Sequence, residues 1–314
     1  MVKSAFLFAG QGSQYVGMGK DLYETFPESR TVFNKADQVL GMPLSKLCFE
    51  GPQEELTQTQ NCQPAILTMS IAAWEAFKVA TGYKPQAQDF AAGLSLGEYS
   101  ALVAAGAISF EDAVYLVRKR GEFMEEAARK KPGKMLSVIG LDLDKVKEVS
   151  AKTSTEIANL NCPGQVVISG SPEGIEEAQK LAEESGAKRA ILLEVSGAFH
   201  SSFMKEASLK LCGELKKIKI NPPLMPLIAN VTASAVTEPA EIRDNLIKQV
   251  TSSVLWEGSM KLLISKGIKN FLEFGPGKVL KGLMRRIDSN IQVTSIEKKE
   301  DILSFIQGGV KYAP

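Results

Sequence analysis

The chain has 314 residues, of which 44% are hydrophobic and 23% charged, a composition typical of a globular protein with one large core or a core plus a smaller domain. Its 37 Lys and Arg residues nearly balance its 36 Asp and Glu residues, so the net charge of +1 gives no reason to expect nucleic acid or an anionic membrane as a partner. The single histidine, His200, excludes a multi-histidine metal centre, and the four scattered cysteines predict neither a disulfide framework nor a zinc site, so we expect no metal.

The apolar stretches of the sequence are short. None reaches the ~18–20 residues that a membrane-spanning helix needs. The apolar stretch near the N-terminus, at 5–9, is too short for the core of a signal peptide. Together with the absence of a disulfide pattern, this predicts a soluble, reduced, cytoplasmic protein.

The first part of the chain alternates strand-like and helix-like segments. A short apolar run at 5–9 ends at Gly10, as a buried strand does, and apolar residues at helical spacing predict a helix over 64–79. A second short strand is predicted over 90–92 and a helix over 97–105. Strands that alternate with helices favour a parallel α/β sheet.

A capped helix and a change of pattern follow. Ser109 and the acidic residues after it form a capping-box-like start, and the helical pattern continues to about Arg129. From 134 to 195 the order is β-α-β-β-α-β, the pattern of a ferredoxin-like unit. Its predicted strands are 135–139, 156–161, 166–169 and 190–195, and its helices are 143–151 and 172–185. We therefore predict that 129–196 is inserted into a larger α/β domain made of 1–128 and 197–314, with further strands at 227–231 and 271–274.

One short motif indicates a nucleophile. Gly93-Leu94-Ser95-Leu96-Gly97 matches G-x-S-x-G between a predicted strand and a predicted helix. Such a tight turn presents the serine hydroxyl at a helix N-terminus, where free backbone N–H groups can stabilise an oxyanion. The motif predicts Ser95 as a nucleophile; the alternative is a plain Gly/Ser turn.

A serine nucleophile needs a base within hydrogen-bonding reach, and His200 is the one imidazole available. It lies where the chain returns from the predicted insertion, and such junctions often line clefts. The alternatives are a structural histidine and a Lys or Asp base. No acidic partner is indicated by spacing, so a backbone carbonyl or an amide could orient the ring.

Arg120 interrupts an apolar stripe. On its predicted helix, Arg120 shares one face with four apolar residues at steps of three and four: Ala113, Val117, Met124 and Ala127. A guanidinium at a buried position requires a planar anionic partner. That partner is either an internal Asp or Glu or the carboxylate of a substrate.

A glycine-rich loop follows the first strand. The sequence GQGSQ at 10–14 fails the dinucleotide pattern G-x-G-x-x-G, because residue 15 is Tyr, and the nearby Gly19-Lys20 fails the P-loop pattern. The loop remains suited to the second half of an oxyanion hole, with a mere tight turn as the alternative.

Taken together, these segments resemble the malonyl-CoA:acyl carrier protein transacylase family and the related acyltransferase domains of polyketide synthases. The matching stretches, in family order, are FAGQGSQ at 8–14, GLSLGEYS at 93–100, RG at 120–121, NCPGQVVISG at 161–170, GAFHS at 197–201 and FGPGKVL at 274–280. They span almost the whole chain. The resemblance implies an α/β fold with a hydrolase-like core, built on a parallel sheet, and an inserted ferredoxin-like subdomain.

The resemblance also implies a ping-pong transfer of a malonyl group from malonyl-CoA to the phosphopantetheine thiol of acyl carrier protein, without a cofactor. It implies Ser95 as the nucleophile, His200 as the base and the backbone N–H groups of Gln11 and Leu96 as the oxyanion hole. Arg120 would bind the malonyl carboxylate. We expect a monomer that serves fatty-acid or polyketide synthesis.

Two further positions follow from the resemblance. Gln249 aligns with the family's active-site glutamine near the histidine, and the segment at 198–201 resembles the malonyl type rather than the methylmalonyl type. The chain departs from the family at Leu94, because a histidine usually precedes the nucleophile there. The departure puts electrostatic help from that neighbour in doubt.

Three other functions use the same residues differently. A serine esterase or thioesterase would use Ser95 and His200 with water as the acceptor, but a hydrolase of neutral esters has no use for a buried Arg120. A non-catalytic carrier-binding subunit of a larger synthase need not keep all three residues. A patatin-like hydrolase would pair Ser95 with an aspartate instead.

Overall fold

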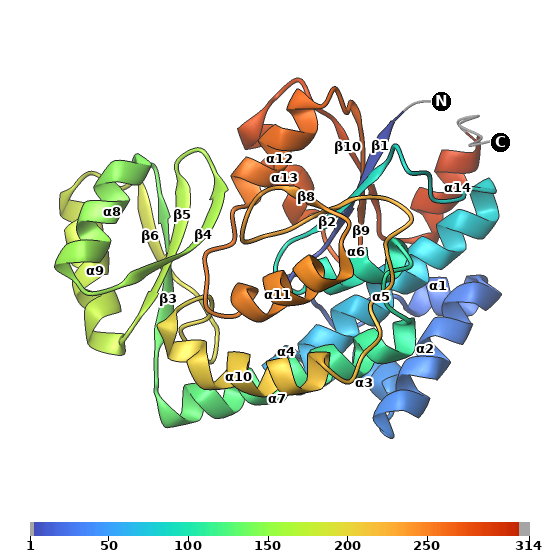
Figure 1. The fold of residues 1–314 in the computed structure, drawn as a ribbon, viewed down its shortest axis with the longest axis horizontal. Coiled ribbons are helices and arrows are strands. Elements are labelled where there is room, and N and C mark those ends of the chain that lie inside the picture. Colours follow the sequence, from blue (N-terminus) through green and yellow to red (C-terminus); the bar gives the residue numbers. More distant parts are fainter. Residues whose placement is uncertain (1–2, 308–314) are drawn as a thin grey trace.

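The computed structural model describes residues 3–307, and its larger sheet has six strands (Figure 1). Their order is β10-β9-β1-β2-β7-β8; every neighbouring pair is parallel except β7 and β8. The strands are β1 (Ser4–Phe8), β2 (Phe90–Gly93), β7 (Leu227–Ile228), β8 (Ala235–Val236), β9 (Asn270–Phe274) and β10 (Val293–Ile296). The predicted parallel α/β sheet is confirmed.

The predicted strand over 227–231 is wrong in its extent. It ends at Ile228, because the chain turns there: the Ala233 N–H donates to the carbonyl of Ala229, and Ala233 has a left-handed backbone with a φ of 49°. The turn leaves Asn230 at the carboxyl end of β7, beside the end of β2.

Helices surround this sheet on both faces. They are α1 (Lys20–Thr25), α2 (Pro27–Leu40), α3 (Leu44–Glu50), α4 (Gln53–Thr57), α5 (Thr59–Thr81), α6 (Gly97–Ala104), α7 (Phe110–Lys130), α10 (Lys205–Leu215), α11 (Pro239–Gln249), α12 (Trp256–Ser265), α13 (Val279–Ile287) and α14 (Lys299–Gln307), with a 3-10 turn at Ser202–Met204. Side chains of β1 alternate between two cores, as the period of a strand requires. Phe6 and Phe8 pack with Trp74 of α5, whereas Ala5 and Leu7 belong to the core formed with α12 and α13.

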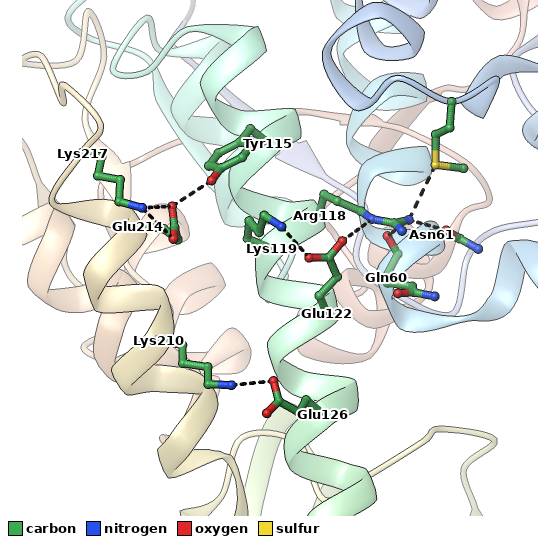
Figure 2. A network of polar contacts seen from close by, with 11 residues as sticks. Gln60, Asn61, Tyr115, Arg118, Lys119, Glu122, Glu126, Lys210, Glu214 and Lys217 are labelled. Atoms are coloured by element: carbon green, nitrogen blue, oxygen red, sulfur yellow. Dashed lines mark hydrogen bonds and ion pairs between the residues drawn. The ribbon is translucent and has the colours of Figure 1, made fainter.

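The helix α5 begins five residues before the predicted start at 64 and therefore contains Pro64 in its interior. A proline cannot donate to the carbonyl four residues earlier. That carbonyl, of Gln60, accepts instead from Nη1 of Arg118 on α7 at 3.1 Å (Figure 2). The helices approach closely at this point, since a Cβ on Gly121 would lie 2.6 Å from the Cα of Gln60.

The second sheet has four strands in the order β4-β5-β3-β6, and every neighbouring pair is antiparallel. Its elements are β3 (Lys134–Ile139), α8 (Leu143–Lys152), β4 (Glu156–Cys162), β5 (Gln165–Gly170), α9 (Pro172–Glu184) and β6 (Arg189–Leu192). This order confirms the predicted β-α-β-β-α-β unit, although β6 ends at Leu192 rather than at 195. The exact boundaries of the insertion, at 128/129 and 196/197, stay a prediction.

One face of the second sheet is covered by its own helices and the other is turned toward the larger sheet. Leu136 and Val138 of β3 pack with α8 and α9, whereas Met135 and Ser137 line a cavity. Backbone bonds join the two parts, since the Leu160 N–H donates to the carbonyl of Val254 at 2.9 Å. Within the described chain, no helix is both long and apolar enough to cross a bilayer.

Candidate active site

Ser95 lies in the turn between β2 and α6, with a left-handed backbone at a φ of 53°. Such a conformation in a non-glycine residue costs on the order of 1–3 kcal/mol and is characteristic of functional sites. The flanking glycines permit the turn: a Cβ on Gly93 would lie 1.9 Å from the carbonyl carbon of Gly97, and one on Gly97 would lie 2.2 Å from the carbonyl oxygen of Phe8. The tight strand-to-helix turn predicted from G-x-S-x-G is therefore present.

A buried amide holds this turn in place. The Ser95 N–H donates to Oδ1 of Asn230 at 2.7 Å, and Nδ2 of Asn230 donates to the carbonyl of Gly93 at 2.8 Å. Both bonds cross from β2 to the residues after β7, so Asn230 offsets the strain of the turn with two hydrogen bonds. Sequence reasoning missed Asn230, because a single asparagine 135 positions away carries no local signal.

His200 lies against the serine. Its Nε2 is 2.8 Å from the Ser95 hydroxyl, and its Nδ1 is 2.8 Å from the carbonyl oxygen of Gln249. A carbonyl only accepts, so Nδ1 carries the proton and Nε2 is free to accept from the serine. Burial, assisted by the positive charge of Arg120, lowers the pKa of His200 to about 4. The imidazole is therefore neutral at pH 7, and its orientation by a neutral acceptor matches the sequence analysis.

Arg120 is also part of the site, and its side chain is only 1% exposed. Its Nη1 donates to Oε1 of Gln63 at 2.8 Å, and its Nη2 donates to the Ser95 hydroxyl at 3.1 Å and to Oε1 of Gln249 at 3.0 Å. The Nε atom has no hydrogen-bond partner in the structure. Among residues 3–307 no carboxylate forms an ion pair with Arg120, so the internal-acid alternative is not supported.

The side chain of Gln249 connects Arg120 to a buried acid. Its Nε2 donates to Oε2 of Glu98 at 2.7 Å and to the carbonyl of Ser95 at 3.0 Å. Burial raises the pKa of Glu98 to about 7, against the opposing effects of hydrogen bonds from Gln249 and Asn230. Sequence reasoning missed Glu98 and Gln63; the one available signal was an acidic residue in the otherwise apolar α6.

The two residues expected to form an oxyanion hole, Gln11 and Leu96, approach the serine from different elements. Gln11 follows β1 and lines the same cavity as Ser95 and His200. Leu96 is buried at the start of α6. Within the described part of the chain, neither backbone N–H donates a hydrogen bond, so both remain available to an incoming oxygen.

A cavity of about 590 Å³ opens over the Ser95–His200 pair, between the two sheets. On one side the cavity is lined by the loop after β1 and by the serine turn, including Leu94. On the other side it is lined by β3, β4 and β5 of the antiparallel sheet. The volume is in the range of pockets that bind small molecules. In the part of the chain described, no group of three or more His, Cys, Asp or Glu residues is arranged to hold a metal ion.

Comparisons with known proteins agree with this geometry. Residues 5–291 match the family model of the acyl transferase domain. The chain is 52% identical over 312 residues to the malonyl CoA-acyl carrier protein transacylase of Bacillus subtilis (strain 168), covering 98% of this chain and 97% of the relative. It is 41% identical over 307 residues to the Staphylococcus aureus (strain MRSA252) protein of the same name, covering 96% and 98%.

Solved structures agree as well. A Bartonella henselae acyl-carrier-protein-S-malonyltransferase superposes with a TM-score of 0.94 at 40% identity, over 98% of this chain and 100% of that one. A malonyl-transacylase solved in complex with its type II PKS acyl-carrier protein has a TM-score of 0.93 at 37% identity, over 98% and 99%.

Proposed function

Since the chain belongs to the acyl transferase domain family and groups there with the malonyl CoA-acyl carrier protein transacylases, we propose that it transfers a malonyl group from malonyl-CoA to acyl carrier protein through an acyl-enzyme on Ser95. The observation that carries the proposal is a serine hydroxyl 2.8 Å from a neutral imidazole and 3.1 Å from a buried arginine without an ion-pair partner among the described residues. Ser95 and His200 carry out the acyl transfer, and Arg120 selects an acyl group that bears a free carboxylate.

In the first half-reaction the Ser95 oxygen attacks the thioester carbonyl carbon, while Nε2 of His200 takes the hydroxyl proton. The tetrahedral oxyanion accepts from the backbone N–H groups of Gln11 and Leu96. The carbon–sulfur bond then breaks, and the imidazolium returns its proton to the departing coenzyme A thiolate. The product is a malonyl ester on Ser95.

The second half-reaction runs the same steps in the opposite direction. The phosphopantetheine thiol of the carrier gives its proton to His200 and attacks the ester carbonyl, and the serine oxygen leaves and regains the proton. The thioester of the donor and the thiol of the acceptor are both carried on a phosphopantetheine arm, so one cavity serves both half-reactions. No step requires a metal or an organic cofactor.

Arg120 binds the free carboxylate of the malonyl group. The acid lies two bonds from the acyl carbon, so a group attached to Ser95 brings it within reach of the guanidinium, whose Nη2 is already 3.1 Å from the serine oxygen. A planar guanidinium suits a carboxylate better than an ammonium does. Gln63 and Gln249 hold the guanidinium with neutral oxygens, and no carboxylate among the described residues is bonded to it.

The competing functions receive less support. The family is a transferase family, which does not favour a thioesterase or esterase, and an assembled Ser95, His200 and Arg120 set does not favour a non-catalytic subunit. The Ser95 hydroxyl contacts His200 and Arg120, and no aspartate within residues 3–307 takes the place a patatin-like enzyme would give it. A monomeric state, a cytoplasmic location and a role in fatty-acid or polyketide synthesis stay predictions.

Isotope exchange tests the covalent step. We expect labelled coenzyme A to enter malonyl-CoA when the enzyme is present and the carrier is absent, because the first half-reaction is reversible on its own. Ser95→Ala should abolish the exchange. Malonyl transfer to the carrier without any exchange would contradict the acyl-enzyme.

A further inference from the structure

The carboxylate of Glu297 joins two loops that border the active-site cavity. Its Oε1 accepts from the hydroxyl of Tyr15 at 2.9 Å and from the backbone N–H of Gly277 at 2.8 Å. Tyr15 belongs to the loop after β1, and Gly277 belongs to the loop between β9 and α13. Glu297 is buried, so both bonds form away from bulk water, where a hydrogen bond is stronger. These three residues, Glu297, Tyr15 and Gly277, are called the Glu297 clamp below.

The two loops lie against each other at the wall of the cavity. A Cβ on Gly277 would be 3.7 Å from the Cβ of Ser13, which is an ordinary contact distance. Gln11 lines the cavity from the first loop, and Val279 lines it from the helix that follows the second. The carboxylate and the phenol ring of the clamp, by contrast, are not part of the cavity wall. The clamp therefore supports the wall from behind.

The acceptor of the clamp is itself held in place. Glu297 directly follows β10, and its backbone N–H donates to Oδ2 of Asp301 on α14 at 2.9 Å. Burial and the hydrogen bond to Glu297 raise the pKa of Tyr15, so its hydroxyl keeps its proton at neutral pH and is the donor. A hydrogen bond to a carboxylate is stronger than one between neutral groups.

The loop after β1 has few other side-chain anchors. The hydroxyl of Ser13 donates to the carbonyl of Gly10, a bond that preserves the shape of the loop without fixing its position. Outside the loop, the side chain of Gln11 reaches Oγ1 of Thr59 at 3.4 Å. The clamp bond of Tyr15, at 2.9 Å and to a residue 282 positions away, is the shorter of these two anchors.

We propose that the Glu297 clamp positions the oxyanion hole: it fixes the loop that carries Gln11, so that the Gln11 N–H already lies where the oxyanion forms. The inference rests on the proposed function and adds a positioning residue that does not touch the substrate. An oxyanion hole is effective because its donors are in place before the charge develops. A loosened donor should therefore slow the formation of every tetrahedral intermediate, whichever acyl group or thiol takes part.

Four single variants test the clamp. Tyr15→Phe removes the donor and keeps the ring, Glu297→Leu removes the acceptor, and Glu297→Gln keeps an acceptor oxygen. Tyr115→Phe is the matched control, because it removes a tyrosine–glutamate hydrogen bond of the same length, 2.9 Å to Glu214, between α7 and α10 (Figure 2).

Three single-turnover rate constants are measured for each variant: acylation by malonyl-CoA, acylation by acetyl-CoA, and discharge onto the carrier. The amplitude of acylation is measured as well, since it reports the fraction of enzyme that is folded. A loss of folded protein lowers the amplitude, whereas a displaced oxyanion hole lowers the rate constants.

For Tyr15→Phe and Glu297→Leu we expect all three rate constants to fall together by about tenfold, less than the roughly 100-fold or more that follows when an oxyanion-hole donor is removed outright. The malonyl-to-acetyl ratio and the malonyl-CoA concentration at half-maximal rate should not change, because the oxyanion exists only after attack. Glu297→Gln and Tyr115→Phe should stay within about twofold of the unaltered enzyme. The double variant Tyr15→Phe/Glu297→Leu should be no slower than Glu297→Leu, because Tyr15 acts through Glu297.

Three results would overturn the positioning role: unchanged rate constants in Tyr15→Phe, an equal loss in Tyr115→Phe, or a lowered malonyl-to-acetyl ratio, which would assign the effect to the side of the cavity that binds the acyl group. A reduced amplitude with unchanged rate constants would also overturn it, since the clamp would then serve folding alone. A failure of the proposed function is a different result, because the unaltered enzyme would then not acylate at all.

Discussion

Replacing Arg120 with alanine should change which acyl group the enzyme accepts more than how fast Ser95 reacts. The guanidinium is 1% exposed and bonded only to neutral oxygens, so a bound carboxylate would form a desolvated, charge-assisted contact. Such a contact is worth about 2–4 kcal/mol, which corresponds to ~30- to 1000-fold in rate. An acetyl group lacks the carboxylate and should lose far less.

The assay is single-turnover acylation of Ser95 with malonyl-CoA and with acetyl-CoA, expressed as kcat/KM for each. Lys119→Ala is a matched control, because Lys119 is the adjacent cation of α7 and pairs with Glu122 outside the site. We expect the malonyl-to-acetyl ratio to fall by at least about 30-fold in Arg120→Ala and to stay unchanged in the control. An equal loss for both acyl groups would refute the carboxylate-binding role.

Further predictions concern the base, the buried acid and the serine turn. Because the pKa of His200 is lowered to about 4, the neutral, basic form of the imidazole dominates above that pH. The acylation rate should therefore stay constant from pH 7 to pH 5 and fall near pH 4. A fall in the rate centred near pH 6.5 would contradict this. Glu98→Leu removes the oxygen that accepts from Nε2 of Gln249 and so turns Oε1 of Gln249 toward Arg120; the malonyl-to-acetyl ratio should therefore fall several-fold, and an unchanged ratio would show that Gln249 needs no such support. Gly97→Ala places a Cβ 2.2 Å from a backbone oxygen and should lower the free energy of unfolding in urea by about 3 kcal/mol or more. The control Gly213→Ala in α10 meets no atom within 4 Å and should raise it by about 0.5–1 kcal/mol, and similar effects of both would contradict the steric argument.

The residues that sequence analysis identified are those with a local pattern. Ser95 is marked by its flanking glycines, Arg120 by an interrupted helical stripe, and His200 by being the single imidazole. Gln249 was reached only through the family resemblance, and the structure adds that its backbone and its side chain act at opposite ends of the site. The patterns that mark Ser95 and Arg120 are local or periodic, whereas His200 follows from the composition of the chain.

The residues that were missed are recognised only in three dimensions. Asn230 and Glu98 act through contacts across 135 and 151 positions of the chain, and nothing in their neighbouring sequence distinguishes them from other polar residues. The same reason limited how much of the fold could be predicted. The predicted helix began at 64, where the apolar spacing starts, whereas α5 begins at Thr59 and Arg118 from another helix satisfies the carbonyl that Pro64 leaves free.

The central claim is a malonyl ester on Ser95 that passes to a thiol and not to water, and intact-protein mass spectrometry tests it most directly. The protein is mixed with malonyl-CoA, with and without acyl carrier protein, beside Ser95→Ala. We predict an adduct that requires Ser95, persists without the carrier and is discharged onto it. An adduct on Ser95→Ala, or one lost equally fast without the carrier, would contradict the transferase mechanism.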